Sequence, residues 1–315
     1  WQFLPLCPPD SSGSPYNSPS GFALNPWFLD ADDLVEDGYL RESELLDLPG
    51  SVKVQSVSLD FSLASKRSVK IGSFLKNGWA NQTSERHSEF EDWSSKQDWL
   101  EDYVCFTELR RQFDELPWWE WPPGLAQHDA NILNDWKSSW EDNLLEHRLL
   151  QWHLDRQWQV IRQTARNLGV LLFGDMPFYV SKDSADVWGN RELFSISQVG
   201  ELQVQSGVPP DYFSSTGQLW GTPVYLWEKH FENQFNWWRR RFDRQWHQLD
   251  LVRLDHFRAL SSYWAVPGDK KTAEDGEWIP SPGKFLLKLL EKDHKGCLDL
   301  VAEDLGIITE EVEEL

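Results

Sequence analysis

Three short apolar segments, each followed by an acidic residue, constrain the fold of this chain most strongly. Residues 170–173 lead to Asp175, residues 251–254 lead directly to Asp255, and residues 298–302 lead directly to Glu303. Helix-like stretches precede the second and third segments, at 228–247 and 284–290. Strands that alternate with helices favour a parallel sheet with helical crossovers. In a TIM barrel the catalytic residues lie at the carboxyl ends of the strands, so the three acidic residues are candidates for chemistry.

The chain divides into three segments by its pattern. Residues 1–60 begin with an apolar run at 1–7, which suits a buried strand, and continue into a long loop rich in Pro and Ser. Residues 61–168 show helical periodicity and form a predicted helical insertion subdomain. Residues 169–315 carry the three strand segments. The predicted fold class is therefore α/β, a partial (β/α)8 TIM-type barrel with a large helical insertion. A Rossmann sheet shares the alternation, but no glycine-rich phosphate-binding loop follows any of the strands.

The charge balance excludes two large classes of partner. The chain has 30 Lys+Arg against 51 Asp+Glu, a formal net charge of −21. That field repels phosphate backbones and anionic lipid, so we expect no nucleic-acid and no membrane binding, whereas a neutral sugar fits. No apolar run approaches the ~20 residues that span a bilayer.

The cysteines and histidines indicate neither a disulfide framework nor a metal site. Cys7, Cys105 and Cys297 are an odd, widely spaced set without a CxxC pair, which a reducing compartment permits. No HExxH spacing occurs, so no metal is predicted, and we expect no cofactor. The chain opens at Trp1 in what looks like mid-strand, and its only methionine is Met176, which is typical of a piece of a longer protein. We expect a cytoplasmic location, with the plastid stroma as the alternative; the oligomeric state is not indicated.

Asp255 and Glu303 qualify as the carboxylate pair of glycosidic chemistry. One carboxylate attacks or stabilises the anomeric carbon, and the other protonates the leaving oxygen. Arg253, two residues before Asp255, points to the same face of its strand, and its permanent charge is expected to keep Asp255 ionised. Glu303 needs the opposite, an apolar setting that keeps it protonated. The alternative interpretation is that both are ion-pairing residues at the rim of a barrel.

Five sequence blocks resemble, in order, those of a known family. Two of them contain the carboxylates, Val252–Arg258 (VRLDHFR) and Val301–Gly306 (VAEDLG). The other three are Ser14–Pro26, Gly174–Trp188 and Pro209–Gly221. Together they are similar to the 4-α-glucanotransferases, also called amylomaltases or disproportionating enzymes, of the α-amylase clan. Because the blocks extend over nearly the whole chain, the resemblance is specific.

The resemblance implies a retaining double displacement on α-1,4-glucans and maltooligosaccharides. Asp255 would be the nucleophile and Glu303 the acid/base, with Arg253 in contact with the nucleophile and the bound sugar. The family pattern implies further substrate contacts on the acceptor side at Asp211, Gln218 and Trp220, and on the donor side at Tyr16, Ser18 and Asp175. His256 either binds a substrate hydroxyl or packs behind the nucleophile for structural reasons.

The resemblance also implies which parts of the family's barrel are present. By this correspondence the chain holds about strands two to five of eight. The first strand would lie before Trp1, and a third essential carboxylate would lie beyond Leu315, so the activity of the chain itself is open. Asp186 and Trp188 are expected to hold their loop in shape.

The 20 tryptophans are expected to serve mainly in packing. Many lie at helical spacings and should pack in the core, as do Trp93, Trp99, Trp136, Trp140 and Trp158. Trp220 is the exception, because it lies in a loop of the resemblance. The cluster of Trp118, Trp119 and Trp121 is interpreted as a surface patch.

Three functional alternatives stay open. A hydrolase of the α-amylase clan shares the nucleophile and the acid, although the loop at 209–220 favours a transferase. A non-catalytic glucan-binding protein would keep the family's surface without turnover. A weaker alternative treats the helical block as a protein-interaction module.

Overall fold

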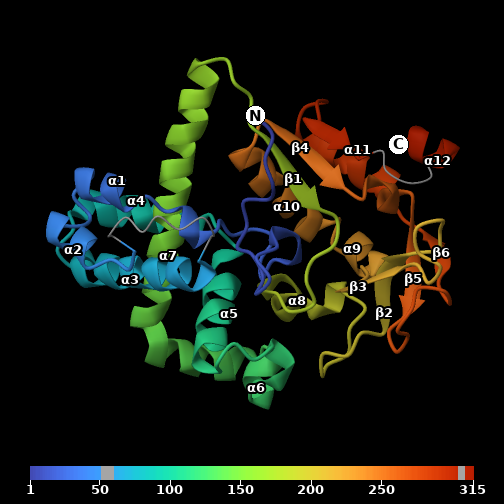
Figure 1. Cartoon of the computed structure of the whole chain (residues 1–315), viewed down its shortest axis with the longest axis horizontal. Helices are drawn as coiled ribbons and strands as arrows, with labels where there is room; N and C mark the ends of the chain where they lie inside the picture. The colour runs from blue at the N-terminus through green and yellow to red at the C-terminus, as the bar shows by residue number, and fades with distance from the viewer. Residues whose placement is uncertain (51–59, 304–308) are drawn as a thin grey trace.

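A computed structural model describes residues 1–50, 60–303 and 309–315, which form a mixed α/β fold (Figure 1). Three strands make a parallel sheet in the order β1-β4-β7: β1 (Phe173–Pro177), β4 (Leu251–Asp255) and β7 (Leu300–Ala302). β4 and β7 lie in the segments that the sequence singled out at 251–254 and 298–302, whereas β1 shares only Phe173 with the predicted segment at 170–173. The predicted parallel pairing is confirmed. Within the described residues this sheet does not close into a barrel.

The segment at residues 1–7, which was predicted to be a buried strand, is not buried. Only Gln2 forms a bridge, which is parallel and pairs it with Phe173 at the start of β1. Trp1 and Leu4 are 70% and 61% exposed. The segment therefore runs beside the parallel sheet without the covering layer that a buried strand needs.

A second, antiparallel sheet was not predicted from the sequence. Its strands are β2 (Val204–Val208), β3 (Gln218–Pro223), β5 (Ser262–Pro267) and β6 (Glu277–Pro280), in the order β3-β2-β5-β6. The Gln, Ser and Gly content of β2 and β3 weakens the apolar alternation that reveals a strand. A short 3₁₀ helix, η5 (Phe257–Leu260), connects the end of β4 to β5. Strand β5 of the second sheet therefore begins close to the carboxyl end of β4.

Helices fill most of residues 61–167, as their periodicity predicted. Before β1 the helices are α1 (Ala31–Glu36), α2 (Glu42–Leu46), α3 (Phe61–Trp79), α4 (Ser84–Ser95), α5 (Leu100–Gln112), α6 (Pro123–Ala126) and α7 (Ala130–Asn167). After β1 they are α8 (Ala185–Gly189), α9 (Trp227–Glu232), α10 (Asn236–Gln248), α11 (Gly283–Asp293) and α12 (Glu310–Glu313). The single helix expected at 228–247 is two, because Phe235 takes a left-handed conformation with φ of 56°. Within the described ranges no helix is long and apolar enough to cross a membrane.

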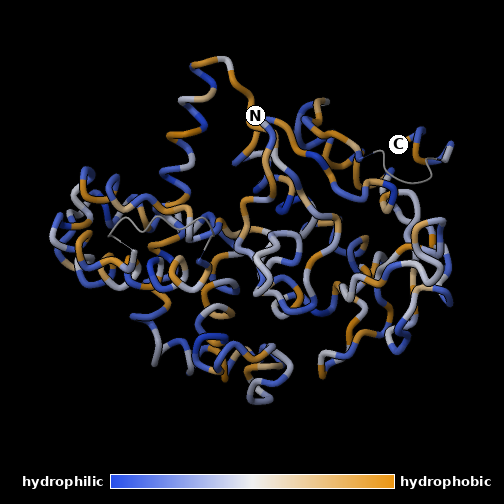
Figure 2. Tube along the Cα trace, in the orientation of Figure 1, coloured by the Kyte–Doolittle hydropathy of each residue, from blue (hydrophilic) through white to orange (hydrophobic). Residues whose placement is uncertain are grey.

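One apolar core extends from the sheets into the helical block. It joins Val252 and Leu254 of β4 with Val104 and Phe106 of α5. A second core forms between α1, α3 and α7. Apolar and polar residues alternate along α7, as in an amphipathic helix (Figure 2). The division into residues 1–60, 61–168 and 169–315 stays a prediction, and residues 51–59, next to its first boundary, lie outside the described ranges.

The tryptophan cluster on the Pro-rich turn is buried, so the predicted surface patch is wrong. Trp118 and Trp121 are 0% and 3% exposed. Their indole N–H groups donate to the backbone carbonyls of Lys182 and Leu116, each at 2.9 Å. The turn therefore folds inward and packs against the loop that follows β1. The expected core packing of helical tryptophans is confirmed for Trp93, Trp99, Trp136 and Trp158.

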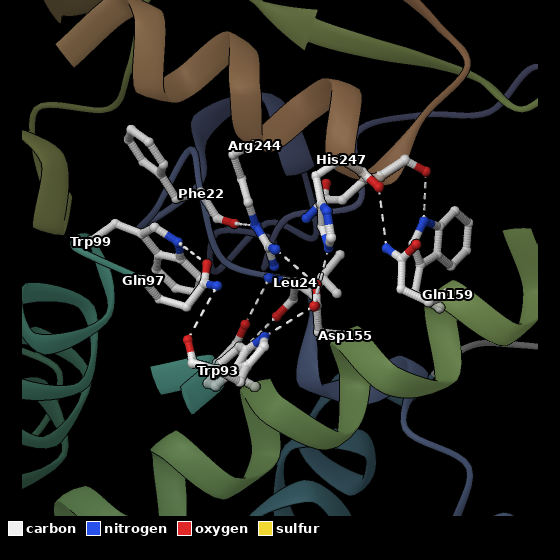
Figure 3. Close-up of polar contacts among 12 residues, drawn as sticks. Phe22, Leu24, Trp93, Gln97, Trp99, Asp155, Gln159, Arg244 and His247 are labelled. Carbon is white, nitrogen blue, oxygen red and sulfur yellow. Dashed lines mark hydrogen bonds and ion pairs between the residues drawn. The ribbon is translucent and has the colours of Figure 1, made fainter. Parts of the chain in front are cut away.

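A buried ionic network joins α7 to α10 and to the loop that precedes α1 (Figure 3). Asp155 accepts hydrogen bonds from Arg244 Nη1 at 2.7 Å and from Trp93 Nε1 at 3.0 Å, and His247 Nε2 lies 3.2 Å from it. Arg244 Nε also donates to the carbonyl of Phe22 at 3.1 Å. Burial raises the pKa of Asp155, but the cations Arg244 and His247 outweigh burial and hold it below its ordinary value. The network therefore fixes the loop at Phe22 to both helices.

Candidate active site

Arg253 holds two carboxylates at the end of the parallel sheet. It lies on β4 two residues before Asp255, so both side chains leave the same face of the strand. Its Nη2 donates to Asp255 Oδ1 at 3.1 Å and to Glu303 Oε1 at 2.7 Å. The two oxygens that share this nitrogen are closer than the sum of those distances. An Oδ1–Oε1 distance below that sum is compatible with the short carboxylate separation of retaining glycosidases (~5–5.5 Å).

Asp175 adds a third carboxylate from the neighbouring strand, where it pairs with Arg253 in the β1–β4 register. It lies within β1, not after the strand as the sequence suggested. Its Oδ2 accepts from Arg253 Nη1 at 2.6 Å and from the Tyr16 hydroxyl at 2.7 Å. Tyr16 is on the 3₁₀ helix η1 (Pro15–Asn17). Burial and the Asp175 carboxylate raise the pKa of Tyr16, so the phenol stays a donor.

The site raises the pKa of Asp255 to about 6. Burial is the largest cause, and repulsion from Glu303 and Asp175 adds to it, while Arg253 acts in the opposite direction. Arg253 therefore favours the ionised form of Asp255, as expected, but burial and the two neighbouring carboxylates outweigh it. At pH values above about 6 Asp255 is still mainly the carboxylate that a nucleophile must be.

Glu303 lies in a polar setting, not in the apolar one that was predicted. Its Oε1 accepts from Arg253, and its Oε2 accepts from the backbone N–H of His256. The strand register explains this arrangement. Leu254 pairs with Ala302, so the residues that follow each of them meet at the sheet end. Both oxygens of Glu303 are therefore held as hydrogen-bond acceptors.

His256 has a backbone role that the sequence did not reveal. Its φ of 58° is left-handed, and its N–H donates to Glu303. Its ring Nε2 is buried without a partner among the described residues, and the rings of Trp220 and Tyr179 lie 4.8 and 6.1 Å away between centroids. Burial and the Arg258 charge lower the pKa of His256 to about 4, so the imidazole is neutral at pH 7. A neutral ring can donate to or accept from a hydroxyl.

The predicted acceptor-side residues lie on or before β3. In the described structure only one of them contacts the cluster, by which we mean Asp175, Arg253, Asp255, His256 and Glu303. Asp211 caps its own turn: its Oδ1 accepts from the backbone N–H groups two and three residues on, at 2.8 and 2.7 Å. Gln218 Oε1 accepts from Trp220 Nε1 at 3.4 Å. Trp220 reaches the cluster by its edge-on ring contact with His256.

The loops around the cluster are held by side chains that bond to backbone. Ser18 Oγ donates to the carbonyl two residues on at 2.7 Å, so its hydroxyl is engaged within its own turn. Asp186 Oδ2 accepts from the N–H of Gly21 at 2.8 Å, and the buried Trp188 Nε1 donates to the carbonyl of Leu125 at 2.9 Å. The structural role predicted for Asp186 and Trp188 is confirmed.

Two residues beside the cluster were not predicted. Tyr179 and Arg241 line a small cavity together with Asp175 and Tyr16. Tyr179 lies four residues after Asp175 at a strand end, which is a signal that sequence reasoning could have used. Arg241 lies in a run of three arginines on a helix, where nothing in the sequence distinguishes it.

Comparison with known proteins decides the family. The family model described as 4-alpha-glucanotransferase matches residues 1–315. The chain belongs to the 4-α-glucanotransferase family. It is 42% identical over 321 residues to the 4-alpha-glucanotransferase of Synechocystis sp. and 37% identical over 317 residues to that of Thermus thermophilus. In both comparisons the match covers 100% of this chain and 62% of the relative. A chloroplastic/amyloplastic 4-alpha-glucanotransferase of Arabidopsis thaliana is 38% identical over 100% of this chain and 54% of its own length.

Solved structures of the family agree with the fold. Amylomaltase from Streptococcus agalactiae in complex with acarbose superposes with a TM-score of 0.91 at 30% identity, over 100% of this chain and 63% of the other. Amylomaltase from Corynebacterium glutamicum shares the fold with a TM-score of 0.79 at 17% identity, over 99% of this chain and 43% of the other. The mixed α/β amylomaltase fold is thus confirmed, and the chain spans about 62% of the length of the bacterial relatives named above.

One block of the family resemblance is described only in part, and the described residues contain no candidate metal site. Residues 304–306, which complete the block that begins at Val301, lie outside the described residues. In the described part of the chain, no group of three or more His, Cys, Asp or Glu side chains is arranged to hold a metal ion.

Proposed function

We propose that this chain carries the nucleophile and the acid/base of a 4-α-glucanotransferase, which moves a segment of an α-1,4-glucan to the 4-OH of a second glucan. The observation that carries the proposal is the single nitrogen of Arg253 shared by Asp255 and Glu303. It keeps the two carboxylates close together, which supports a double displacement. Because the chain spans about 62% of its bacterial relatives, the activity and substrates of the whole protein are part of the proposal.

The reaction has two displacements at the anomeric carbon. In the first, the Asp255 carboxylate bonds to C1 while the C1–O bond breaks, and protonated Glu303 gives its proton to the departing oxygen. In the second, the acceptor 4-OH gives its proton to the Glu303 carboxylate, its oxygen bonds to C1, and the ester to Asp255 breaks. Two inversions give net retention, and no oxidant or cofactor takes part.

Arg253 serves both displacements by holding the two carboxylates in place. It also lowers the pKa of Asp255, against the burial and the neighbouring carboxylates that raise it. Asp175 and Tyr16 hold Arg253 in turn, through the shared Asp175 Oδ2. We assign Asp175 and Tyr16 to the donor side, where they border the sugar that Asp255 attacks.

The remaining substrate contacts are assigned by their place around this cluster. His256 and Trp220 form a wall beside the carboxylates, where a neutral imidazole and an indole face suit a glucose ring. Asp211 and Gln218 are assigned to the acceptor side, on or before β3. Ser18 is assigned to shaping the donor loop and presenting its backbone to substrate.

The architecture is proposed to be part of a (β/α)8 barrel. The segment at 1–7, β1, β4 and β7 would be neighbouring strands two to five, with residues 61–168 as a helical insertion. The relatives include bacterial and chloroplastic or amyloplastic proteins, and we propose the bacterial cytoplasm, with the plastid stroma as the alternative.

Incubation with maltotriose tests the proposal, with products separated by chromatography. A transferase forms glucose and chains longer than maltotriose, whereas an α-amylase-clan hydrolase forms only shorter chains. A non-catalytic glucan-binding protein leaves maltotriose intact while still binding acarbose. Asp255→Asn and Glu303→Gln should each abolish the longer chains, and the exposed change Asp269→Asn should leave them unchanged.

A second donor separates the roles of the two carboxylates. In maltotriosyl fluoride the leaving group is fluoride, which departs without a proton from an acid. Glu303→Gln should therefore release a burst of fluoride from this donor although it fails on maltotriose, and Asp255→Asn should react with neither donor. If Asp255→Asn consumed either donor at the wild-type rate, the assignment of the nucleophile would be wrong.

A further inference from the structure

Arg241 is a buried arginine whose guanidinium bonds only to neutral oxygens among the described residues. It lies on α10 and is 1% exposed. Its Nη1 donates to the carbonyl of Phe178 at 2.9 Å and to the Tyr225 hydroxyl at 3.4 Å, and its Nη2 donates to the carbonyl of Pro177 at 2.6 Å. A buried charge is costly unless it is paired and fully hydrogen-bonded, so this position calls for an explanation.

The two carbonyls that Arg241 binds mark the end of β1. Pro177 is the last residue of that strand, and Asp175 lies two residues before it. The Arg241 guanidinium thus fixes the backbone at the end of β1, and Asp175 on the same strand accepts a hydrogen bond from Arg253 through its Oδ2. Through this chain of contacts a helix outside the cluster reaches the guanidinium that both catalytic carboxylates share.

A cavity of about 20 Å³ lies between Arg241 and Asp175 and is also lined by Tyr179. Asp175 Oδ1, Arg241 Nε and the Tyr179 hydroxyl are each buried and without a hydrogen-bond partner among the described residues. One water needs roughly 10–15 Å³ of such space and two or more polar partners. Gly21 also lines the cavity, and a Cβ there would lie 3.2 Å from Arg241 Nε, so only a glycine leaves this nitrogen uncrowded.

We propose that Arg241 is a positioning residue for the catalytic cluster, and that one water in this cavity joins its Nε to Asp175 Oδ1. The water accepts from Arg241 and donates to the carboxylate, while Asp175 keeps its other oxygen for Arg253. Arg241 touches no substrate in this arrangement and acts through Asp175 alone. The inference rests on the proposed transferase function for its kinetic test, but the water site stands on its own.

Arg241→Met removes the charge and the donors while keeping an unbranched side chain of related size. We expect kcat with maltotriose to fall about 100-fold, the effect of a small misplacement of catalytic groups, and KM to change less than about twofold. Because Arg253 lowers the pKa of Asp255, loosening Arg253 should also move the acidic limb of the rate profile to higher pH. Arg241→Lys keeps the charge and should recover part of kcat.

The matched control is Arg239→Met on the same helix, where the arginine pairs with Asp293 near the surface. It should leave kcat and the pH profile unchanged. A high-resolution crystal structure of the wild-type chain should show one ordered water within ~3.2 Å of both Arg241 Nε and Asp175 Oδ1.

Three results would overturn the inference. They are a wild-type kcat in Arg241→Met, a loss of kcat with an unmoved pH profile and no recovery in Arg241→Lys, or a cavity filled by side chains with no water. If Arg241→Met does not fold, as judged by circular dichroism, Arg241→Lys and the crystal structure decide. If the wild-type chain makes no transfer products, the proposed function fails instead, and crystallography still decides the water site.

Discussion

Asp255→Asn should stabilise the folded chain at neutral pH while it removes the proposed nucleophile. Burial and two neighbouring carboxylates raise the pKa of Asp255 from 3.8 to about 6, so the folded state is destabilised by keeping this group ionised. A shift of about two pKa units corresponds to about 3 kcal/mol at pH values above both pKa values. The side chain is 31% exposed, so solvent screening reduces the expected gain to about 1–2 kcal/mol. Asparagine keeps an oxygen that can accept from Arg253, so the local geometry should persist.

The sign of this effect depends on pH in a defined window. A group whose pKa is raised by folding binds its proton more tightly in the folded state, so it destabilises the fold only once it ionises. The penalty is absent below the unfolded value of 3.8, grows as pH rises, and is complete above about 6. The stabilisation in Asp255→Asn should therefore be full at about pH 7 and nearly gone at about pH 4.

Urea unfolding of both proteins at the two pH values measures the difference in free energy of unfolding. Asp250→Asn is a control with the opposite sign, because the backbone N–H of Leu172 and the cations Arg166 and Arg162 lower the pKa of Asp250 against its burial. It should destabilise the chain at neutral pH. An Asp255→Asn protein that is no more stable than wild type at pH 7, or whose gain is equal at both pH values, would refute the reasoning.

Three further predictions follow from the same contacts. The acidic limb of kcat/KM for maltotriose should have its midpoint near the pKa of Asp255, about 6, and a midpoint below about 4.5 would contradict the assignment. Tyr16→Phe removes the hydroxyl that Asp175 accepts and should lower kcat/KM about 10-fold or more, because hydrogen bonds to charged groups are worth about 1.5–3 kcal/mol; an unchanged value would show that Tyr16 does not support Arg253. Asp155→Ala leaves the buried Arg244 unpaired and should cost about 3–5 kcal/mol in urea unfolding, and a cost below about 1 kcal/mol would mean that the network in Figure 3 is not structural.

The sequence predicted the strand ends of the site because local rules decide them. Alternation along a strand places Arg253 and Asp255 on one face, and an apolar run followed by a carboxylate marks a strand end. Those rules are sufficient to locate the chemistry at the ends of β4 and β7. The family resemblance then supplied the roles of the two carboxylates.

The sequence predictions that failed concerned features that depend on contacts between segments far apart in the chain. The polar setting of Glu303 comes from the β4–β7 register. The raised pKa of Asp255 comes from burial and from carboxylates 80 and 48 positions away in sequence, and a local pattern reveals none of these causes. The burial of Trp118 and Trp121 comes from a turn that folds under the loop after β1. The antiparallel sheet was missed because its strands pair over polar and glycine-rich sequence.

The measurement that tests the central claim most directly is the site of the covalent glycosyl-enzyme. Glu303→Gln treated with maltotriosyl fluoride, without an acceptor, should accumulate the intermediate, because the second displacement lacks its base. Peptide mapping by mass spectrometry should then find one maltotriosyl group on the peptide that contains Asp255. A maltotriosyl group on another carboxylate, or turnover of the fluoride donor in Asp255→Asn, would contradict the account.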